Sequence, residues 1–165
     1  MFKLKPLSAE AIPAALDKAT CYRYLNEPAE AESICLDILE VEPDNQQALM
    51  TLILALTDQF AHELRQPFVR AREAVKRLTD NYCRNYYRGI ICERRAKVHF
   101  GRGNPGSGHL AYDWLRQAMS AYEKALDARL SGNDDAVLRW NACARMIMNN
   151  SDLVAGHEGR ESMLE

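Results

Sequence analysis

The sequence predicts an all-α protein, and three observations carry that prediction. Apolar residues recur three and four positions apart along most of the chain, which places them on one side of a helix. No segment alternates apolar and polar residues for long enough to indicate a strand. Proline, aspartate and asparagine stand where helices would begin, as at Pro28, Asp44, Pro67 and Asn133. A chain of 165 residues is long enough for one domain with an ordinary core.

Seven helices are predicted from these signals. The first two are separated by the turn before Pro28, and Pro43 ends the second because proline lacks a backbone donor. The third contains the run ALMTLILAL, which is apolar on nearly all sides and is therefore expected to lie between other helices. The fourth has one apolar stripe, formed by Phe68, Ala71 and Val75, opposite a charged face. The predicted helical ranges are 9–25, 28–41, 45–63, 67–79, 82–100, 109–130 and 134–148.

A glycine-rich stretch, GRGNPGSG, separates the fifth and sixth helices at residues 101–108. A phosphate-binding loop would require a preceding strand and a lysine followed by a hydroxyl residue, and both are missing from this sequence. We therefore expect a slack connection of eight residues. Asn133 is placed to cap the seventh helix, which carries Trp140 as an apolar seal. Residues 149–165 are expected to form a flexible C-terminal tail.

Residues 14–49 carry the clearest pattern of a helix pair. A small residue, Ala19, and an aromatic one, Tyr22, are spaced as on the packed face of a first helix, and Pro43 closes the unit. The packing positions of the second helix are Ala31, Cys35 and Ile38. This segment resembles a tetratricopeptide repeat, a helix-turn-helix unit of about 34 residues. It departs from the family at Ala15, where an aromatic residue is common, and at the third of those packing positions, where alanine is usual.

The resemblance implies a right-handed α-solenoid of about three helix pairs with a C-terminal capping helix, in a single domain of residues 1–148. The implied units are residues 12–45, 46–80 and 81–132, followed by the capping helix at 134–148. Repeats of this family commonly hold peptides on a concave surface, so the resemblance also implies a protein-binding scaffold. The lysines and asparagines with which some members clamp a C-terminal carboxylate are absent from the matching positions of the first two units.

Charge is strongly segregated along the chain, although the net charge is only −2. Residues 24–64 contain no lysine or arginine, whereas residues 65–103 hold eleven basic residues against three acidic ones. The small net charge predicts no bulk attraction to nucleic acid or to a membrane surface. The longest apolar run, at residues 48–56, is far shorter than the roughly 20 residues of a membrane span. Five widely spaced cysteines with no CxxC pair indicate reduced thiols and a cytoplasmic protein.

The predicted fifth helix carries the candidate binding residues. Arg84, Arg88 and Arg95 fall on one helical face, and Tyr87 flanks them. The resemblance implies that part of this helix lies along the concave surface, which makes these four residues a candidate peptide-binding site. An alternative is that the arginines are solvated or form ion pairs with acidic residues of the first repeat.

The sequence therefore predicts a cytoplasmic, non-catalytic scaffold or adaptor that binds a protein or peptide segment, with an acidic segment as the candidate ligand. No catalytic residue, metal or cofactor is expected, no nucleic-acid or membrane partner is expected, and self-association is left open. The alternative is a small helical enzyme or metal-binding domain that uses His99, His109 and Asp113. His109 and Asp113 share a helix face, and His99 precedes the glycine-rich stretch.

Overall fold

The computed structural model describes residues 2–156, and the all-α prediction is confirmed over that range. Seven α-helices and one turn of 3₁₀ helix are present, and this part of the chain contains no strand. None of the helices described is both long enough and apolar enough to cross a membrane. The elements are η1 (Ala9–Ala11), α1 (Ile12–Tyr24), α2 (Pro28–Val41), α3 (Gln46–Asp58), α4 (Arg65–Lys76), α5 (Asn81–Arg102), α6 (Ser107–Leu126) and α7 (Asp135–Met148).

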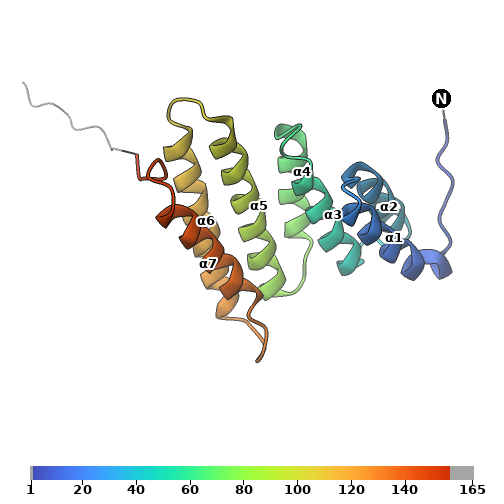
Figure 1. The fold of residues 1–165 in the computed structure, drawn as a ribbon. Coiled ribbons are helices and arrows are strands. Elements are labelled where there is room, and N and C mark those ends of the chain that lie inside the picture. Colours follow the sequence, from blue (N-terminus) through green and yellow to red (C-terminus); the bar gives the residue numbers. More distant parts are fainter. Residues whose placement is uncertain (1, 157–165) are drawn as a thin grey trace, which may run out of the picture.

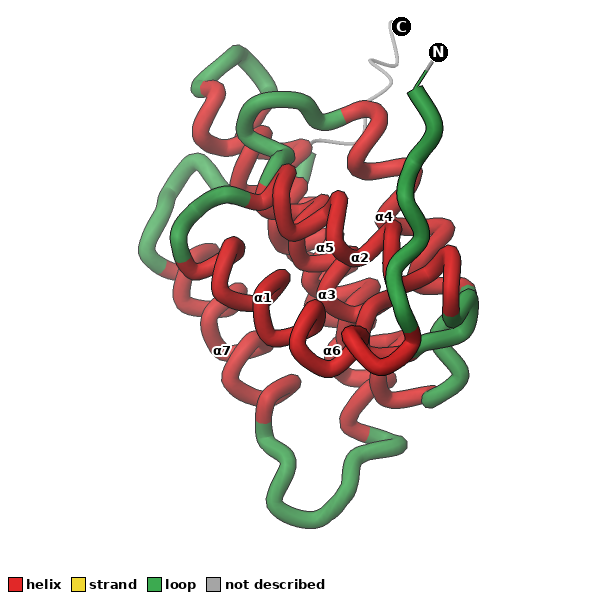
Figure 2. The backbone as a smooth tube through the Cα atoms, turned by 90° about the vertical axis from the view of Figure 1, so that its right-hand side faces the viewer, coloured by secondary structure: helices red, strands yellow, loops and turns green. Residues whose placement is uncertain are grey.

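The helices follow one another in a row from α1 at one end to α6 and α7 at the other (Figure 1). Each helix packs against the next along the chain, and α3 also contacts both α1 and α5. Figure 2 views the row from the α1 end, with the loops at the ends of the helices. As predicted, α3 is buried between its neighbours, with Leu49, Ile53 and Leu56 fully inaccessible.

Two hydrophobic cores meet at α5. The first core is formed mainly by α1 to α4 and includes Ile91 of α5. The second is formed mainly by α5, α6 and α7 and includes Ile90, the adjacent residue of the same helix. Because Ile90 and Ile91 point into different cores, α5 is the wall that the two cores share.

The connection between α5 and α6 is shorter than predicted. Instead of eight residues of slack, only residues 103–106 are non-helical, because α5 continues to Arg102 and α6 begins at Ser107. Gly103 (φ 63°) ends α5 and Gly106 (φ 79°) precedes α6, and both adopt the left-handed conformation that glycine accommodates without strain. Gly108 lies within α6, where a Cβ atom would approach the Asp152 carbonyl oxygen to 2.2 Å.

The first part of the predicted C-terminal tail packs against the fold. Leu153 is 2% exposed and belongs to the second core. The Nδ1–H group of His109 donates to the carbonyl oxygen of Val154 at 2.9 Å. Residues 149–154 therefore differ from the free tail that was expected, and residues 157–165 lie outside the described range. Trp140 is half-buried and donates from Nε1 to Glu123 Oε1 at 2.9 Å, so it covers the preceding helices less completely than the apolar seal that was predicted.

A buried polar network joins α5, α6 and α7. The ring of Tyr122 lies directly against Gly89, and its hydroxyl donates to Glu93 Oε2 at 2.7 Å. The other carboxylate oxygen, Oε1, accepts from Lys97 at 2.5 Å and from Arg139 at 3.3 Å. Burial on its own would raise the pKa of Glu93, but the hydrogen bonds from Lys97 and Tyr122 outweigh it and lower the pKa. Glu93 is therefore a buried carboxylate that stays ionised.

Gly89→Ala should destabilise the protein, whereas Gly101→Ala should not. At position 89 a Cβ atom would lie 2.3 Å from Tyr122 Cε1, and this buried ring is held by its hydrogen bond to Glu93. Overpacking of this kind costs about 1–3 kcal/mol, more than alanine gains over glycine in a helix. A Cβ atom at position 101 would have no atom of another part of the chain within 4 Å. Alanine there should therefore stabilise α5 by up to about 1 kcal/mol. Urea unfolding followed by circular dichroism measures the free energy of unfolding of both variants. Equal changes in the two variants would contradict the close packing of Tyr122 against Gly89.

Glu93→Gln should lower stability by about 1–3 kcal/mol at neutral pH, because the partly exposed cations Lys97 and Arg139 lose their ionised partner. The lowered pKa of Glu93 means that its contribution is complete above its ordinary value of 4.5. That contribution is lost as the pH falls through the folded-state pKa. The stability difference between the wild type and the variant should therefore shrink below about pH 4.5 in unfolding experiments. A difference that stays constant down to about pH 3 would show that folding does not lower the pKa of Glu93.

Candidate functional site

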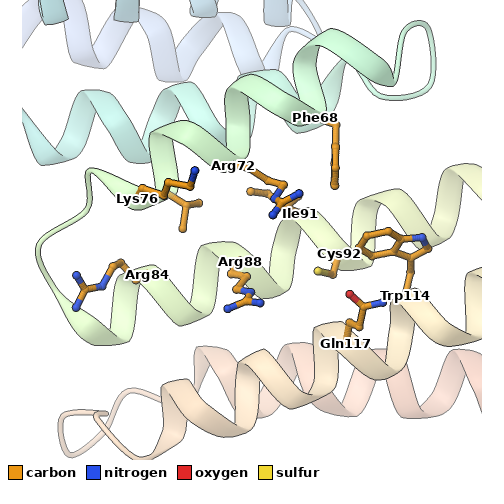
Figure 3. A pocket seen from close by; sticks show the side chains of 10 residues that line it. Phe68, Arg72, Lys76, Arg84, Arg88, Ile91, Cys92, Trp114 and Gln117 are labelled. Atoms are coloured by element: carbon orange, nitrogen blue, oxygen red, sulfur yellow. The ribbon is translucent and has the colours of Figure 1, made fainter.

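A cavity of about 390 Å³ opens between α4, α5 and α6 (Figure 3), and we call it the α4–α6 cavity. Three helices supply its walls, and the residues that line it are Phe68, Arg72, Val75, Lys76, Arg84, Arg88, Ile91, Cys92, Trp114 and Gln117. Two of the predicted binding residues, Arg84 and Arg88, therefore line a recess, and both remain exposed to solvent.

Four of the lining residues are cations, and none is an acid. Arg72 and Lys76 are one turn apart on α4, and Arg84 and Arg88 are one turn apart on α5. Lys76 pairs with the exposed carboxylate of Glu73 at 2.7 Å. The three arginines form no ion pair with any residue in the described range. The cavity therefore gathers three arginine charges that no ion pair in the described part of the fold neutralises, beside a lysine that is paired with Glu73.

Internal ion pairs were the alternative for the arginines on this face of α5, but other arginines form them. Asp58, at the end of α3, pairs with Arg23 of α1 at 2.8 Å and also with Arg94 of α5. Glu32 of α2 pairs with Arg70 of α4. The alternative in which Arg84, Arg88 and Arg95 pair with acids of the first repeat is therefore wrong among the described residues. Of the acids in residues 12–45, only Glu32 pairs with an arginine in the described structure, and that arginine is Arg70.

Arg95 has a structural position beside the cavity. Its guanidinium carbon lies 4.0 Å from the ring centroid of Phe68 and 4.1 Å from that of Trp114. The two rings meet edge to face, with centroids 5.8 Å apart. Burial lowers the pKa of Arg95, and the nearby charge of Arg72 lowers it further. Arg95 thus supports two aromatic walls of the cavity without lining it, and its binding role stays a prediction.

Tyr87 lies on a different side of α5. It lines a separate recess with Met50 of α3 and with Tyr82, Cys83 and Tyr86 of its own helix. Burial raises the pKa of Tyr87 to about 12. Tyr87 therefore faces α3 and the connection between α6 and α7, whereas Arg84 and Arg88 face α4 and α6.

The alternative metal site is not assembled. No group of three or more histidine, cysteine, aspartate or glutamate side chains in residues 2–156 is placed to hold a metal ion. His109 is bonded to the backbone of Val154, and Asp113 is exposed. His99 accepts from Arg95 Nε at 3.4 Å, and burial, together with the charges of Arg95 and Arg102, lowers its pKa. The structure therefore does not bring His99, His109 and Asp113 together.

The walls that α4 and α6 contribute to the cavity were not predicted from the sequence. Phe68, Arg72 and Lys76 are spaced four apart, a pattern that predicts one stripe on α4. That spacing could have drawn attention to Arg72. No local signal indicates that Trp114, 46 positions after Phe68 in the sequence, would meet it across α5.

Arg95→Ala should lower the free energy of unfolding by about 1–2 kcal/mol, because two ring faces lose their cation and the packing of its aliphatic stem. Arg84→Ala should change stability by no more than about 0.5 kcal/mol, since Arg84 is exposed and unpaired within the described residues. Chemical denaturation of both variants provides the measurement. Equal losses would show that the two arginines do not differ in role.

Comparison with known proteins gives no further guide to the site. A scan against models of protein families finds no match for this chain, and a search of curated proteins finds no relative. The resemblance of residues 14–49 to a tetratricopeptide repeat therefore stays a prediction, and the α4–α6 cavity is the firmest basis for a functional conclusion.

Proposed function

We propose that this chain is a non-catalytic protein-binding scaffold that holds an acidic segment of a partner protein in the α4–α6 cavity. The observation that carries the proposal is the set of four cations in a recess with no acidic residue in its lining. Like charges gathered in one place repel each other and add nothing to folding. A bound anion relieves that repulsion, so the arrangement favours a negatively charged ligand.

Carboxylates of a protein segment fit this recess well. The planar guanidinium of arginine donates two parallel hydrogen bonds to one carboxylate, and three of the four cations are arginines. Arg84 and Arg88 are exposed, and partly exposed pairs contribute on the order of 1 kcal/mol each. These pairs alone correspond to roughly millimolar affinity that falls as salt is added, so tighter binding requires apolar contacts as well.

The architecture forms part of the same proposal. Successive packing of α1 to α7, with α3 also contacting α1 and α5, supports a right-handed α-solenoid of about three tetratricopeptide-like pairs in which α7 caps the end. Such stacks offer extended surfaces for partner proteins. In this chain the candidate surface lies between the second helices α4 and α6, and not along the first helices.

Nucleic acid fits the observations less well than protein. Phosphate backbones are usually followed by an extended basic stripe, whereas these cations lie within one recess. The neighbouring region, residues 24–64, contains no basic residue and would repel a long polyanion.

The proposal predicts that Arg84→Glu with Arg88→Glu abolishes the binding of a fluorescein-labelled hexaglutamate peptide, measured by fluorescence anisotropy. Loss of two pairs of about 1 kcal/mol should weaken binding by roughly 30-fold, and charge reversal should weaken it further. Circular dichroism and the melting temperature should stay unchanged.

The matched control is Arg65→Glu with Arg145→Glu, which changes the net charge equally at two exposed positions outside the cavity. It should weaken binding only slightly. Equal losses in both variants would mean that bulk charge and not the cavity binds the peptide. If the wild-type protein bound duplex DNA but not the peptide, the proposal of an acidic protein segment as the ligand would be wrong.

A further inference from the structure

We propose that the α4–α6 cavity selects a partner segment in which acidic side chains are followed, at a fixed spacing, by an aromatic or large apolar anchor. This inference rests on the proposed function and names the pattern that the cavity would recognise. The carboxylates would lie between Lys76 and Arg84 and between Arg72 and Arg88. The anchor would lie beside Phe68 and Trp114.

The lining of the cavity changes character along α5. Figure 3 shows Lys76 and Arg84 near the turn that joins α4 to α5, with Arg72 and Arg88 further along. At the other end, Phe68, Cys92 and Trp114 replace the cations. One end is therefore cationic and the other mainly apolar.

The apolar end retains uncovered surface. Phe68 and Trp114 are only half-buried, although both are large aromatic side chains at the wall of a recess. Their rings are fixed edge to face, and Arg95 lies over both of them. An aromatic anchor would cover this surface against rings that are already in place, so little side-chain freedom would be lost on binding.

The size of the cavity favours a segment that uses both ends. A volume of about 390 Å³ lies within the range of roughly 300–1,000 Å³ typical of ligand pockets, and it is large enough for several side chains. An acidic segment without an anchor would leave the aromatic end in water. An apolar segment without acids would leave the cations unneutralised in the recess.

The helical spacing of the lining sets the spacing of the pattern. Arg84, Arg88 and Cys92 are successive turns of α5, so their levels are about 6 Å apart along the helix axis. In an extended segment, alternate side chains point to the same face and are about 6.6–6.8 Å apart. An extended segment with acids at two alternate positions and an anchor at the third would therefore match the three levels.

Three synthetic peptides with blocked ends test the inference on the wild-type protein. The patterned peptide is Glu-Ser-Glu-Ser-Phe, the anchorless peptide is Glu-Ser-Glu-Ser-Ala, and the reordered peptide is Glu-Ser-Phe-Ser-Glu. Affinities are measured by competition against the fluorescein-labelled patterned peptide. We expect the patterned peptide to bind about 10–100-fold more tightly than the anchorless one, as burial of one phenylalanine side chain predicts. The reordered peptide should lose most of that gain.

Tryptophan fluorescence provides a second readout at the apolar end. The chain has two tryptophans, so Trp140→Phe leaves Trp114 as the only reporter. The patterned peptide should shift its emission to shorter wavelength, whereas the anchorless peptide should not.

The outcomes separate this inference from the proposed function. Equal affinity of the patterned and anchorless peptides would overturn the anchor but leave acidic binding intact. Equal affinity of the patterned and reordered peptides would overturn the spacing. Failure of every peptide, and of hexaglutamate, would overturn both proposals.

Discussion

The close approach of α5 and α6 is the constraint on which the rest of the C-terminal half depends. Gly89 gives the ring of Tyr122 room against α5, and Glu93 holds the Tyr122 hydroxyl while it also binds Lys97 and, from α7, Arg139. With α6 fixed in this way, its Trp114 reaches across α5 to Phe68 of α4. The α4–α6 cavity is the space that these contacts leave beside α5.

Arginine has two opposite roles in this fold. Arg23 and Arg94 converge on Asp58 and so link α1, α3 and α5 through one carboxylate. Arg72, Arg84 and Arg88 have no such partner among the described residues, and their charges repel one another. The first group stabilises the native state through ion pairs, whereas the second leaves positive charge on the wall of the cavity, where the guanidinium carbon of Arg72 also lies 5.6 Å from the ring centroid of Phe68.

The helices were predictable from sequence because their signals are local. Apolar spacing placed all seven helices within a few residues, except that α3 ends at Asp58, five residues early. The predicted caps were each one residue off, because α3 is capped by Asn45 and not Asp44, and α7 begins after Asp134 and not Asn133. Glycine was the misleading signal, since Gly101 and Gly108 are helical. Helical projection correctly put Arg84 and Arg88 together. It could not show that Arg95 would meet two rings from other helices, because that contact depends on tertiary packing.

The two cores that share α5 also share the cavity. Phe68, Val75 and Ile91 pack with the first core, whereas Cys92 and Trp114 pack with the second. A segment bound in the cavity would therefore contact residues from both cores. Its binding free energy would be lost when either core unfolded. Occupancy would thus couple the unfolding of the two halves, and a chain whose halves could open separately when empty would open as a single cooperative unit when bound.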